Sequence, residues 1–425
     1  MPYSFFESIF FGVPGVGLIS SLLRFYVLFF CSIWFELRSK DFTVLSFHRV
    51  VVLTMLFIGF PALMVWNHVG FILDDILFPE WRNQPVVKPV FIVGNARSGT
   101  TWIHRLLVDL LEDRFTTMLT WEIVFAPSVT WRRLFLWCYD VDQQIGSPLY
   151  RAVCTFEKFL IGAGRGHKLH EVGLQMAEED EWLMAHIGMA QLLCFFFPYG
   201  AAVLSPLISF DLPSPDSSAP TLCGSSRRMV LGFYRQCVQR HLYARRAGEL
   251  VFLSKNPPFT LRIESIYATF QDCRVVCMLR DPVQSVPSMV SYISKVYHTF
   301  CSPHITYPNA RELLQYCISH YQYPLEQLNS RKRPSYQWAF VKYHSLQTNL
   351  CGTLLELLNS LGILKPESKR NKNFYNALRK KLAAEQHSIC HFKSTHRHSV
   401  QECCGMSESE LKSILRVVYQ AHQFE

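Results

Sequence analysis

Charged side chains are scarce in this sequence. Asp, Glu, Lys and Arg make up 18% of its 425 residues, yet Lys and Arg outnumber Asp and Glu by 42 to 33, which gives a formal net charge of +9. The excess basic residues are scattered and form no long basic run. This pattern disfavours a nucleic-acid groove and favours a small anionic ligand, so we expect no nucleic-acid partner.

Cysteines are too sparse for a disulfide scaffold, since the chain has 14 of them in 425 residues. The paired CxxC spacing of a structural zinc site is also missing. Cysteines and histidines crowd together only between Cys390 and Cys404, where their spacing matches no known ligand pattern. We therefore predict no metal site.

Charge is absent from the run between Val50 and Trp66, and with its flanks this run reaches the roughly 20 residues that a bilayer-crossing helix needs. The earlier apolar run, from Phe5 to Phe35, is interrupted by charged residues such as Arg24 and predicts a poor span or an interfacial hairpin. The sequence thus predicts a membrane anchor over residues 1–80, with the stronger span at about 50–71. A cleavable signal peptide is not expected, because the first ten residues lack a basic segment.

The orientation of this anchor follows from the basic residues between the two apolar runs. Arg38, Lys40 and Arg49 should remain cytoplasmic, which would make everything after Phe71 lumenal. The same orientation results whether the first run spans the membrane or lies on its surface. An Asn-x-Ser/Thr acceptor is absent from the sequence, so glycosylation offers no support for a lumenal domain.

A different pattern begins after a short polar linker. The apolar run Pro89 to Val93 predicts a buried strand, and the periodic segment Thr101 to Leu111 predicts a helix directly after it. Strand, loop and helix in this order are typical of an α/β fold. We expect one α/β domain over residues 88–425, with a P-loop-like parallel sheet flanked by helices.

Two more short apolar runs predict parallel strands, Leu250 to Leu253 and Arg274 to Leu279. Each is followed by a basic residue, Lys255 in one case and Arg280 in the other. Ligands of open α/β sheets bind at the carboxyl ends of the strands. The basic residues should therefore meet the loop that follows the first strand in one crevice.

That loop reads Gly-Asn-Ala-Arg-Ser-Gly-Thr-Thr over residues 94–101. Its glycines permit close approach to a ligand, and the backbone N–H groups at the start of the helix suit a phosphate. A nucleotide-triphosphate P-loop has a lysine after its second glycine, whereas this chain has Thr100 there. The missing lysine argues against an ATPase or a kinase. The cation of this loop is Arg97.

The run from Arg97 to Thr101 resembles the 5′-phosphosulfate loop of the sulfotransferases that use PAPS (3′-phosphoadenosine 5′-phosphosulfate). A second segment, Arg280-Asp281-Pro282 followed by Ser288, resembles the 3′-phosphate site of the same family, with the same interval from Arg to Ser. An Arg and a Ser so placed can clamp a terminal phosphate by charge-assisted hydrogen bonds. The resemblance extends from about Pro89 to the C-terminus and is greatest to the divergent membrane-associated branch.

The resemblance implies a role for each matching residue. Arg280 and Ser288 would hold the 3′-phosphate, Trp102 would stack on adenine, and Lys255 would steady the leaving oxygen. The residues that would bind the 5′-phosphosulfate group are Arg97, Ser98, Gly99, Thr100 and Thr101.

The general base of cytosolic relatives, a histidine, is absent from this sequence, which has Pro257 at that position. Protein-tyrosine sulfotransferases use a glutamate five residues before a proline, an arrangement that Glu122 and Pro127 repeat. We predict that Glu122 is the base. His167 and His170 are the other candidates, since a histidine has a suitable intrinsic pKa.

The sequence thus predicts a membrane sulfotransferase, located in the Golgi or another endomembrane with a lumenal catalytic domain. It would transfer a sulfuryl group from PAPS to a hydroxyl or amine of a carbohydrate, lipid or protein, without a metal. Two alternatives remain. One is a P-loop kinase-like enzyme. The other is a catalytically silent membrane protein that keeps the fold, which the departure at Pro257 leaves open.

Overall fold

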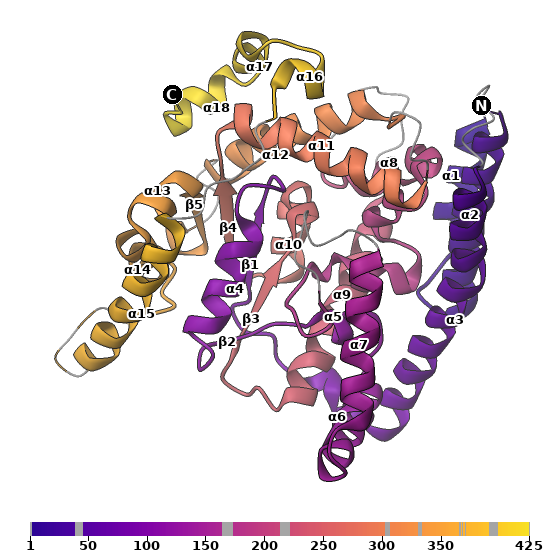
Figure 1. Ribbon diagram of the computed structural model, residues 1–425, viewed down its shortest axis with the longest axis horizontal. Coiled ribbons are helices and arrows are strands. Elements are labelled where there is room, and N and C mark those ends of the chain that lie inside the picture. The colour runs from indigo at the N-terminus through magenta and orange to yellow at the C-terminus, as the bar shows by residue number, and fades with distance from the viewer. Residues whose placement is uncertain are drawn as a thin grey trace. The chain divides into compact units, whose positions relative to one another are not determined.

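The structure is a computed structural model (Figure 1). The residues that it describes are 2–38, 46–163, 173–212, 222–301, 307–329, 334–364, 367, 369, 371–390 and 398–424. The chain divides into two compact units, each assembled from separate stretches. The first unit contains Met1–Val86, Thr116–Leu250 and Tyr292–Pro308, and the second contains Val87–Phe115, Val251–Ser291 and Asn309–Glu425.

The second unit is built on a five-stranded sheet in the order β2-β3-β1-β4-β5. Its strands are β1 (Val90–Gly94), β2 (Phe115–Thr116), β3 (Val251–Lys255), β4 (Arg274–Leu279) and β5 (Trp338–Lys342). The pairs β1–β3, β1–β4 and β4–β5 are parallel. Every residue of β1 and β4 is buried, as expected of central parallel strands covered on both faces. The predicted α/β fold with a parallel sheet is confirmed.

Alternate residues of β1 show how the two faces of the sheet are covered. Ile92 belongs to an apolar core with residues of α4 (Thr100–Leu110), α14 (Leu350–Ser360) and α15 (Lys372–Cys390). Phe91 points the other way, and its ring centroid lies 6.1 Å from that of Phe259 and 5.3 Å from that of Phe270. Helices therefore flank both faces.

The remaining helical elements of the second unit follow the strands or close the C-terminus. They are η7 (Pro257–Arg262), α10 (Ile263–Thr269), α12 (Ala310–Asn329), η8 (Ser335–Gln337), α13 (Tyr343–Thr348), α16 (Val400–Cys404), α17 (Glu408–Ile414) and α18 (Arg416–His422). The helix α11 (Pro282–Phe300) begins in the second unit and ends in the first.

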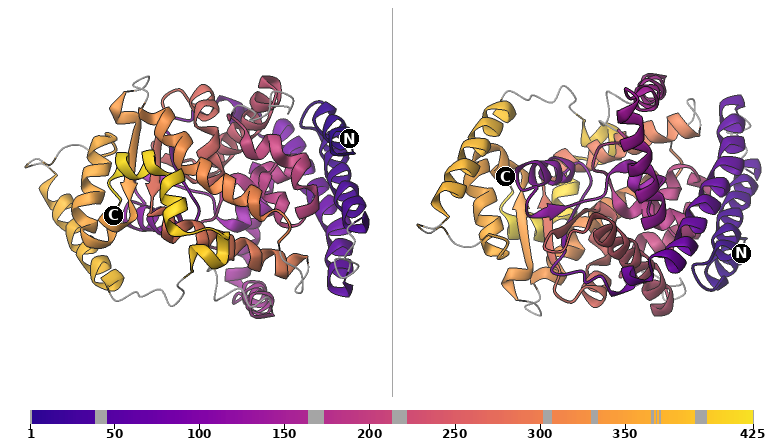
Figure 2. Two further views of the ribbon diagram at one scale, coloured as in Figure 1. Left: turned by 90° about the horizontal axis from the view of Figure 1, so that it is seen from above. Right: turned by 90° about the horizontal axis from the view of Figure 1, so that it is seen from below.

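The first unit is helical. Its elements are α1 (Pro2–Gly12), α2 (Leu18–Arg38), α3 (Phe47–Leu77), η2 (Pro79–Asn83), α5 (Thr120–Val124), α6 (Val129–Gln144), α7 (Pro148–Ala163), η4 (Asp180–Ile187), η5 (Gln191–Phe195), η6 (Pro198–Gly200), α8 (Ala201–Ser209) and α9 (Gly224–Arg245). The helices α2 and α3 run side by side in both views of Figure 2 and pack on each other.

Among the described helices, α2 and α3 have the length and the apolar composition to cross a membrane. The apolar part of α3 is only 17% buried, against 39% for α2, so α3 presents more apolar surface. Both helices belong to the same compact unit as residues 116–250. This division differs from the expected one, in which an anchor over residues 1–80 precedes a separate catalytic domain over 88–425.

Candidate functional site

The two glycines of the loop after β1 are required by its backbone. Gly94 has φ +119°, and a Cβ there would lie 2.3 Å from the carbonyl oxygen of Met278. Gly99 precedes α4 with φ +87°, and a Cβ there would lie 2.5 Å from the ring of Tyr343. Any other residue would be strained and would displace a neighbour, so the glycine spacing is fixed by this fold.

Arg97 also has a left-handed backbone, with φ +70°. Such strain in a residue other than glycine is typical of functional loops. The loop is held by a hydrogen bond of 2.7 Å from the backbone N–H of Gly94 to the hydroxyl of Thr260. The first turn of α4 closes with a bond from Ile103 N to Gly99 O, so the amides that precede Ile103 begin a helix and suit an anion.

The structure brings the two sequence motifs together. Nε of Arg97 donates a hydrogen bond of 3.3 Å to the hydroxyl of Ser288, and Nη1 of Arg280 donates one of 3.1 Å to the carbonyl oxygen of Arg97. The guanidinium of Arg280 lies 5.0 Å from the ring centroid of Tyr343, whose ring also meets that of Trp102 edge-on at 6.0 Å. Residues from both motifs thus form one cluster around Tyr343.

Lys255 lies at the carboxyl end of β3 and pairs in register with Ile92 of β1. Its Nζ donates a hydrogen bond of 3.3 Å to the hydroxyl of Thr101. Lys255 is fully buried, and a buried ammonium group is costly unless polar or anionic groups surround it.

Two tyrosines that the sequence analysis did not single out hold the Arg280 turn. The hydroxyl of Tyr321 contacts Ser285 and donates to the carbonyl oxygen of Arg280 at 2.7 Å. The hydroxyl of Tyr419, on α18, donates to the carboxylate of Asp281 at 2.7 Å. Burial raises the pKa of both phenols, so they remain neutral donors. Isolated tyrosines in two distant helices carry no local signal of this role.

A buried histidine lies near the position where cytosolic relatives have theirs. His320 on α12 hydrogen-bonds through Nδ1 to the carbonyl oxygen of Tyr316 at 2.8 Å. Burial lowers its pKa to about 4, although backbone contacts with Tyr316 and Pro257 act in the opposite direction. His320 is therefore neutral at physiological pH.

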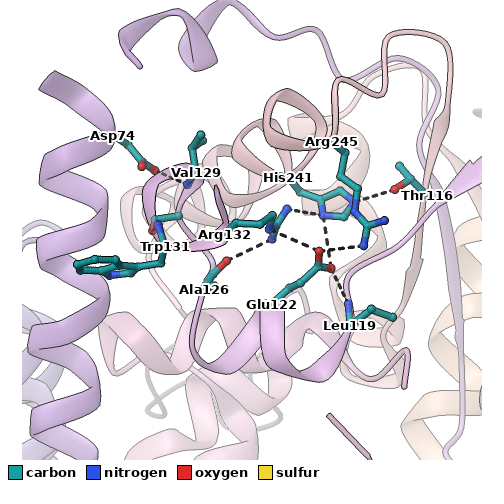
Figure 3. Close-up of polar contacts among 11 residues, drawn as sticks. Asp74, Thr116, Leu119, Glu122, Ala126, Val129, Trp131, Arg132, His241 and Arg245 are labelled. Carbon is teal, nitrogen blue, oxygen red and sulfur yellow. Dashed lines mark hydrogen bonds and ion pairs between the residues drawn. The ribbon is translucent and has the colours of Figure 1, made fainter. Parts of the chain in front are cut away.

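Glu122, the predicted base, belongs to the first unit and is buried on α5 (Figure 3). Its Oε1 lies 2.9 Å from Nη2 of Arg245 and 3.5 Å from Nε of Arg132. Its Oε2 accepts a hydrogen bond of 2.8 Å from the backbone N–H of Leu119 and so caps its own helix. Both oxygens of the carboxylate are engaged in this cluster.

His241 completes the cluster as a neutral ring (Figure 3). Burial, together with the charges of Arg132 and Arg245, holds its pKa well below the usual value. Nδ1 accepts from Nη1 of Arg132 at 2.7 Å, so Nε2 carries the proton and donates to the hydroxyl of Thr116 at 2.8 Å. The 3.9 Å approach of Nδ1 to Glu122 is therefore not an ion pair.

The sequence analysis also named two histidines as candidates for the general base. His167 and His170 lie outside the described residues. Within the part of the chain that the structure describes, no group of three His, Cys, Asp or Glu side chains comes close enough to hold a metal.

Comparisons with known proteins agree with this fold. Residues 215–367 match the model of the sulfotransferase family, a range that contains Lys255, Arg280 and Ser288 but not the loop at 94–101. Omega-hydroxy-beta-dihydromenaquinone-9 sulfotransferase Stf3 of Mycobacterium bovis is 25% identical over 253 residues, which are 59% of this chain and 55% of that protein. The protein of the same name from Mycobacterium tuberculosis matches equally. The match thus spans about half the length of these curated relatives.

Two crystal structures resemble nearly the whole chain. Sulfotransferase STF9 from Mycobacterium avium has a TM-score of 0.64 at 16% identity, and the match covers 91% of this chain and 88% of that one. Sulfotransferase STF1 from Mycobacterium tuberculosis has a TM-score of 0.61 at 18% identity, with coverage of 96% and 95%. The structure therefore has the sulfotransferase fold. The sequence matches show similarity to the same family.

Proposed function

We propose that this protein is a sulfotransferase that uses PAPS as its donor. The observation that carries the proposal is the meeting of Arg97, Ser288 and Arg280, which joins a phosphate-type loop to a second anion-binding segment. A donor with phosphate groups at both its 5′ and 3′ ends needs two such anion sites, whereas ATP needs only one. The residues present suit this donor, because cations and hydroxyls occur in both segments.

Different residues of this cluster bind different parts of the donor. Arg97 and the hydroxyls of Thr100 and Thr101 hold the 5′-phosphosulfate, and Arg280 with Ser288 holds the 3′-phosphate. Trp102 stacks on the adenine. In the transfer, the bond from sulfur to the donor phosphate oxygen breaks as a bond from sulfur to the acceptor forms. Lys255 stabilises the negative charge that develops on the leaving phosphate oxygen.

The acceptor must lose a proton, and we propose Glu122 as the base that takes it. The resemblance to protein-tyrosine sulfotransferases supports this assignment. The contacts of Glu122 with Arg132 and Arg245 also give it a structural role. A test must therefore separate the two roles.

Among hydroxyl and amine acceptors, we propose a hydroxyl of a membrane lipid. The curated relatives are named for action on omega-hydroxy-beta-dihydromenaquinone-9, a hydroxylated lipid, and the exposed apolar face of α3 suits a protein that works at a membrane. Those relatives are mycobacterial proteins, so they lend no support to a Golgi location. Our proposal for location is a membrane.

The donor can be tested by measuring the affinity of the full chain for PAP (adenosine 3′,5′-bisphosphate), ATP and ADP. We expect a preference for PAP, and a loss of roughly tenfold or more in PAP affinity for Arg280→Ala, since a hydrogen bond to a charged group contributes about 1.5–3 kcal/mol. Arg311→Ala, an exposed arginine on α12, is the matched control. Equal binding of ATP and PAP would favour the kinase-like alternative. PAP binding without turnover on any hydroxylated lipid would favour the silent protein.

A further inference from the structure

The hairpin of α2 and α3 is fixed to the rest of the first unit at the end where the two helices are joined. Nε and Nη2 of Arg49 donate to the buried carboxylate of Glu36, at 3.1 and 2.5 Å. Nη1 of Arg49 donates to the carbonyl oxygen of Phe300 at 3.0 Å, and Nε2 of His48 lies 2.6 Å from that of Thr299. Residues 299–300 therefore lie against this end.

The opposite end of the hairpin is fixed in the same way to other segments. Nδ2 of Asn67 donates to the carbonyl oxygen of Val124 at 2.9 Å. The buried carboxylate of Asp74 accepts from the backbone N–H groups of Val129 at 2.9 Å and of Thr130 at 2.7 Å, and so caps α6. On α2, Arg24 donates to the carbonyl oxygen of Ile187 at 3.0 Å.

These contacts leave no room for a bilayer around α3. Arg49 and Asn67 lie about 27 Å apart along one helix, which is less than the roughly 30 Å of a hydrocarbon core. The same folded unit contacts α3 at both points, so a bilayer between them would have to pass through that unit. Between them, Phe197 of an irregular segment packs on Phe25 and Phe29, and lipid does not accommodate exposed irregular backbone.

The comparison with solved structures supports the same conclusion. The match to STF1 covers 96% of this chain, which leaves too few residues unmatched to exclude α2 and α3 from the shared fold. The hairpin is thus part of the folded unit and not an anchor added to it.

The outer face of α3 nevertheless remains apolar and exposed. Met55 is 68% exposed, Ile58 66%, Ile72 58% and Ile76 68%. Removing large apolar side chains of this kind from water is favourable. An exposed apolar surface of this kind on a folded protein usually marks an interaction site.

A second apolar surface continues from α3 onto α6 and α7. The rings of Trp66 and Trp131 stack at 4.0 Å, and the indole N–H of Trp131 donates to the carbonyl oxygen of Trp66 at 2.8 Å, which ties α6 to α3. The helices α6 and α7 expose large apolar side chains at helical spacing, namely Leu134, Trp137 and Val141 on α6, Ile145 directly after it, and Leu149, Val153 and Phe156 on α7.

Aromatic and basic residues accompany these stripes. Tyr139 and Tyr150 are exposed and pack edge-on with centroids 5.7 Å apart, and Arg151 and Lys158 are exposed on α7. Tyrosine and tryptophan favour the boundary between lipid and water, and arginine and lysine attract anionic headgroups. Tyrosine, tryptophan and arginine also occur in protein interfaces, but the core of such an interface is depleted of lysine, so the exposed Lys158 favours lipid.

We propose that the exposed apolar side chains of α3, α6 and α7 form a lipid face, which inserts into one leaflet of an anionic phospholipid membrane without crossing it. The protein is then monotopic. The basic residues between α2 and α3 no longer determine a lumenal orientation, because neither α2 nor α3 passes through the bilayer. This inference is independent of the donor and of the reaction.

Binding to lipid can be measured with the purified full chain by flotation with vesicles of phosphatidylcholine and phosphatidylglycerol. We expect Ile58→Asp and Trp137→Asp each to lower the partition coefficient by roughly tenfold or more, since each removes a buried apolar group and adds a repelling charge. The matched control is Val417→Asp on α18, where the side chain is 68% exposed and lies outside the lipid face. Equal melting temperatures would show that all three variants fold.

Self-association is the competing use of this surface. If Ile58→Asp and Trp137→Asp convert an oligomer to a monomer and leave flotation unchanged, the surface is an interface between copies and the proposal is overturned. An equal loss of flotation in Val417→Asp would also overturn it.

Crossing can be tested separately from binding. An epitope is inserted between Arg38 and Ser46, a second is placed at the C-terminus, and both are probed with antibody on sealed membrane vesicles before and after detergent. The monotopic arrangement puts both epitopes on the same side. Any crossing by α3 puts them on opposite sides, and that result would refute the proposal even if flotation depends on Ile58.

Discussion

Nε of Arg97 donates a hydrogen bond to the hydroxyl of Ser288 at 3.3 Å, although 191 residues separate them in the chain. Arg97 follows β1 and Ser288 lies on α11, which follows β4. These strands are parallel neighbours, so their carboxyl ends bring the two residues to the same edge of the sheet. The contact fixes the two proposed anion-binding segments relative to each other.

This arrangement makes Gly99 sensitive to substitution. Gly99→Ala would force an alanine into φ +87° and bring its Cβ to 2.5 Å from the ring of Tyr343. We expect PAP affinity to fall by at least roughly tenfold as the ring and the loop shift, which corresponds to about 1.4 kcal/mol. Isothermal titration with PAP measures the change.

Gly362→Ala is the control for this substitution, because Gly362 also has a positive φ of +61° but has nothing within 4 Å of an added Cβ. It carries the cost of backbone strain without the steric clash. Equal loss of PAP affinity in the two variants would show that the contact with Tyr343 is unimportant.

Tyr419 should support PAP binding through Asp281. Tyr419→Phe removes the 2.7 Å hydrogen bond to that carboxylate and loosens the turn that carries Arg280. We expect stability to fall by about 0.5–1.5 kcal/mol, and PAP affinity to fall severalfold as Arg280 loses its fixed position.

Tyr375→Phe provides the comparison, since it removes a 2.9 Å phenol hydrogen bond to Asn359 elsewhere in the same unit. Both variants should lose a similar free energy of unfolding in urea denaturation, while only Tyr419→Phe should weaken the binding of PAP. A parallel loss of PAP affinity in both would mean that the effect is general destabilisation.

The elements predicted best from the sequence are those with local signals. The strand predicted at Arg274 to Leu279 coincides with β4, and that at Pro89 to Val93 is displaced by one residue from β1. Continuous apolar runs define central strands without further context. The edge strand β5 was not predicted, although Trp338 to Val341 form a short apolar run, and its residues are mostly half-buried.

Long-range contacts explain what the sequence could not predict. The boundary expected between residues 80 and 88 assumed that the apolar N-terminal segments fold apart from the rest. Asn67 and Asp74 instead bond to backbone groups of Val124 and Val129, more than 50 positions later. A buried polar residue in an apolar helix shows that a partner exists but not which one. The sequence could not predict the partners of Glu122 for the same reason.

The role of Glu122 in the reaction can be separated from its role in the fold. Glu122→Gln weakens the contacts with Arg132 and Arg245, and loss of one partner of a buried ion pair costs about 3–5 kcal/mol. If Glu122 is the base, we also expect kcat to fall by roughly 10²- to 10⁴-fold with PAP affinity retained. Turnover with a hydroxylated lipid and PAPS, together with PAP titration, measures both.

Asp74→Asn is the matched variant. Asp74 is a fully buried carboxylate of the same unit, 3.0 Å from Nε of Arg240, and no catalytic role is proposed for it. Both variants should melt at lower temperature. If kcat falls equally in both, or if Glu122→Gln retains kcat, Glu122 is structural only.

Stability should decline in mild acid because buried histidines must be neutral in the folded protein. Burial lowers the pKa of His186 from 6.5 to about 4, and Nε2 hydrogen-bonds to the carbonyl oxygen of Ile123 at 2.8 Å. Between these two pKa values the unfolded chain binds a proton that the folded chain does not. The contribution of the neutral His186 to the free energy of unfolding is therefore complete above pH 6.5. It is lost as the pH falls toward 4, by about 1.4 kcal/mol per pH unit.

Urea denaturation at several pH values between 7 and 4 can isolate this contribution. His186→Gln cannot titrate, so its free energy of unfolding should decline less steeply with falling pH than that of the unsubstituted chain, by about 1.4 kcal/mol per unit in this window. His298→Gln, which replaces a histidine on the exposed end of α11, should leave the slope unchanged. Identical slopes in all three proteins would mean that His186 takes up its proton without unfolding.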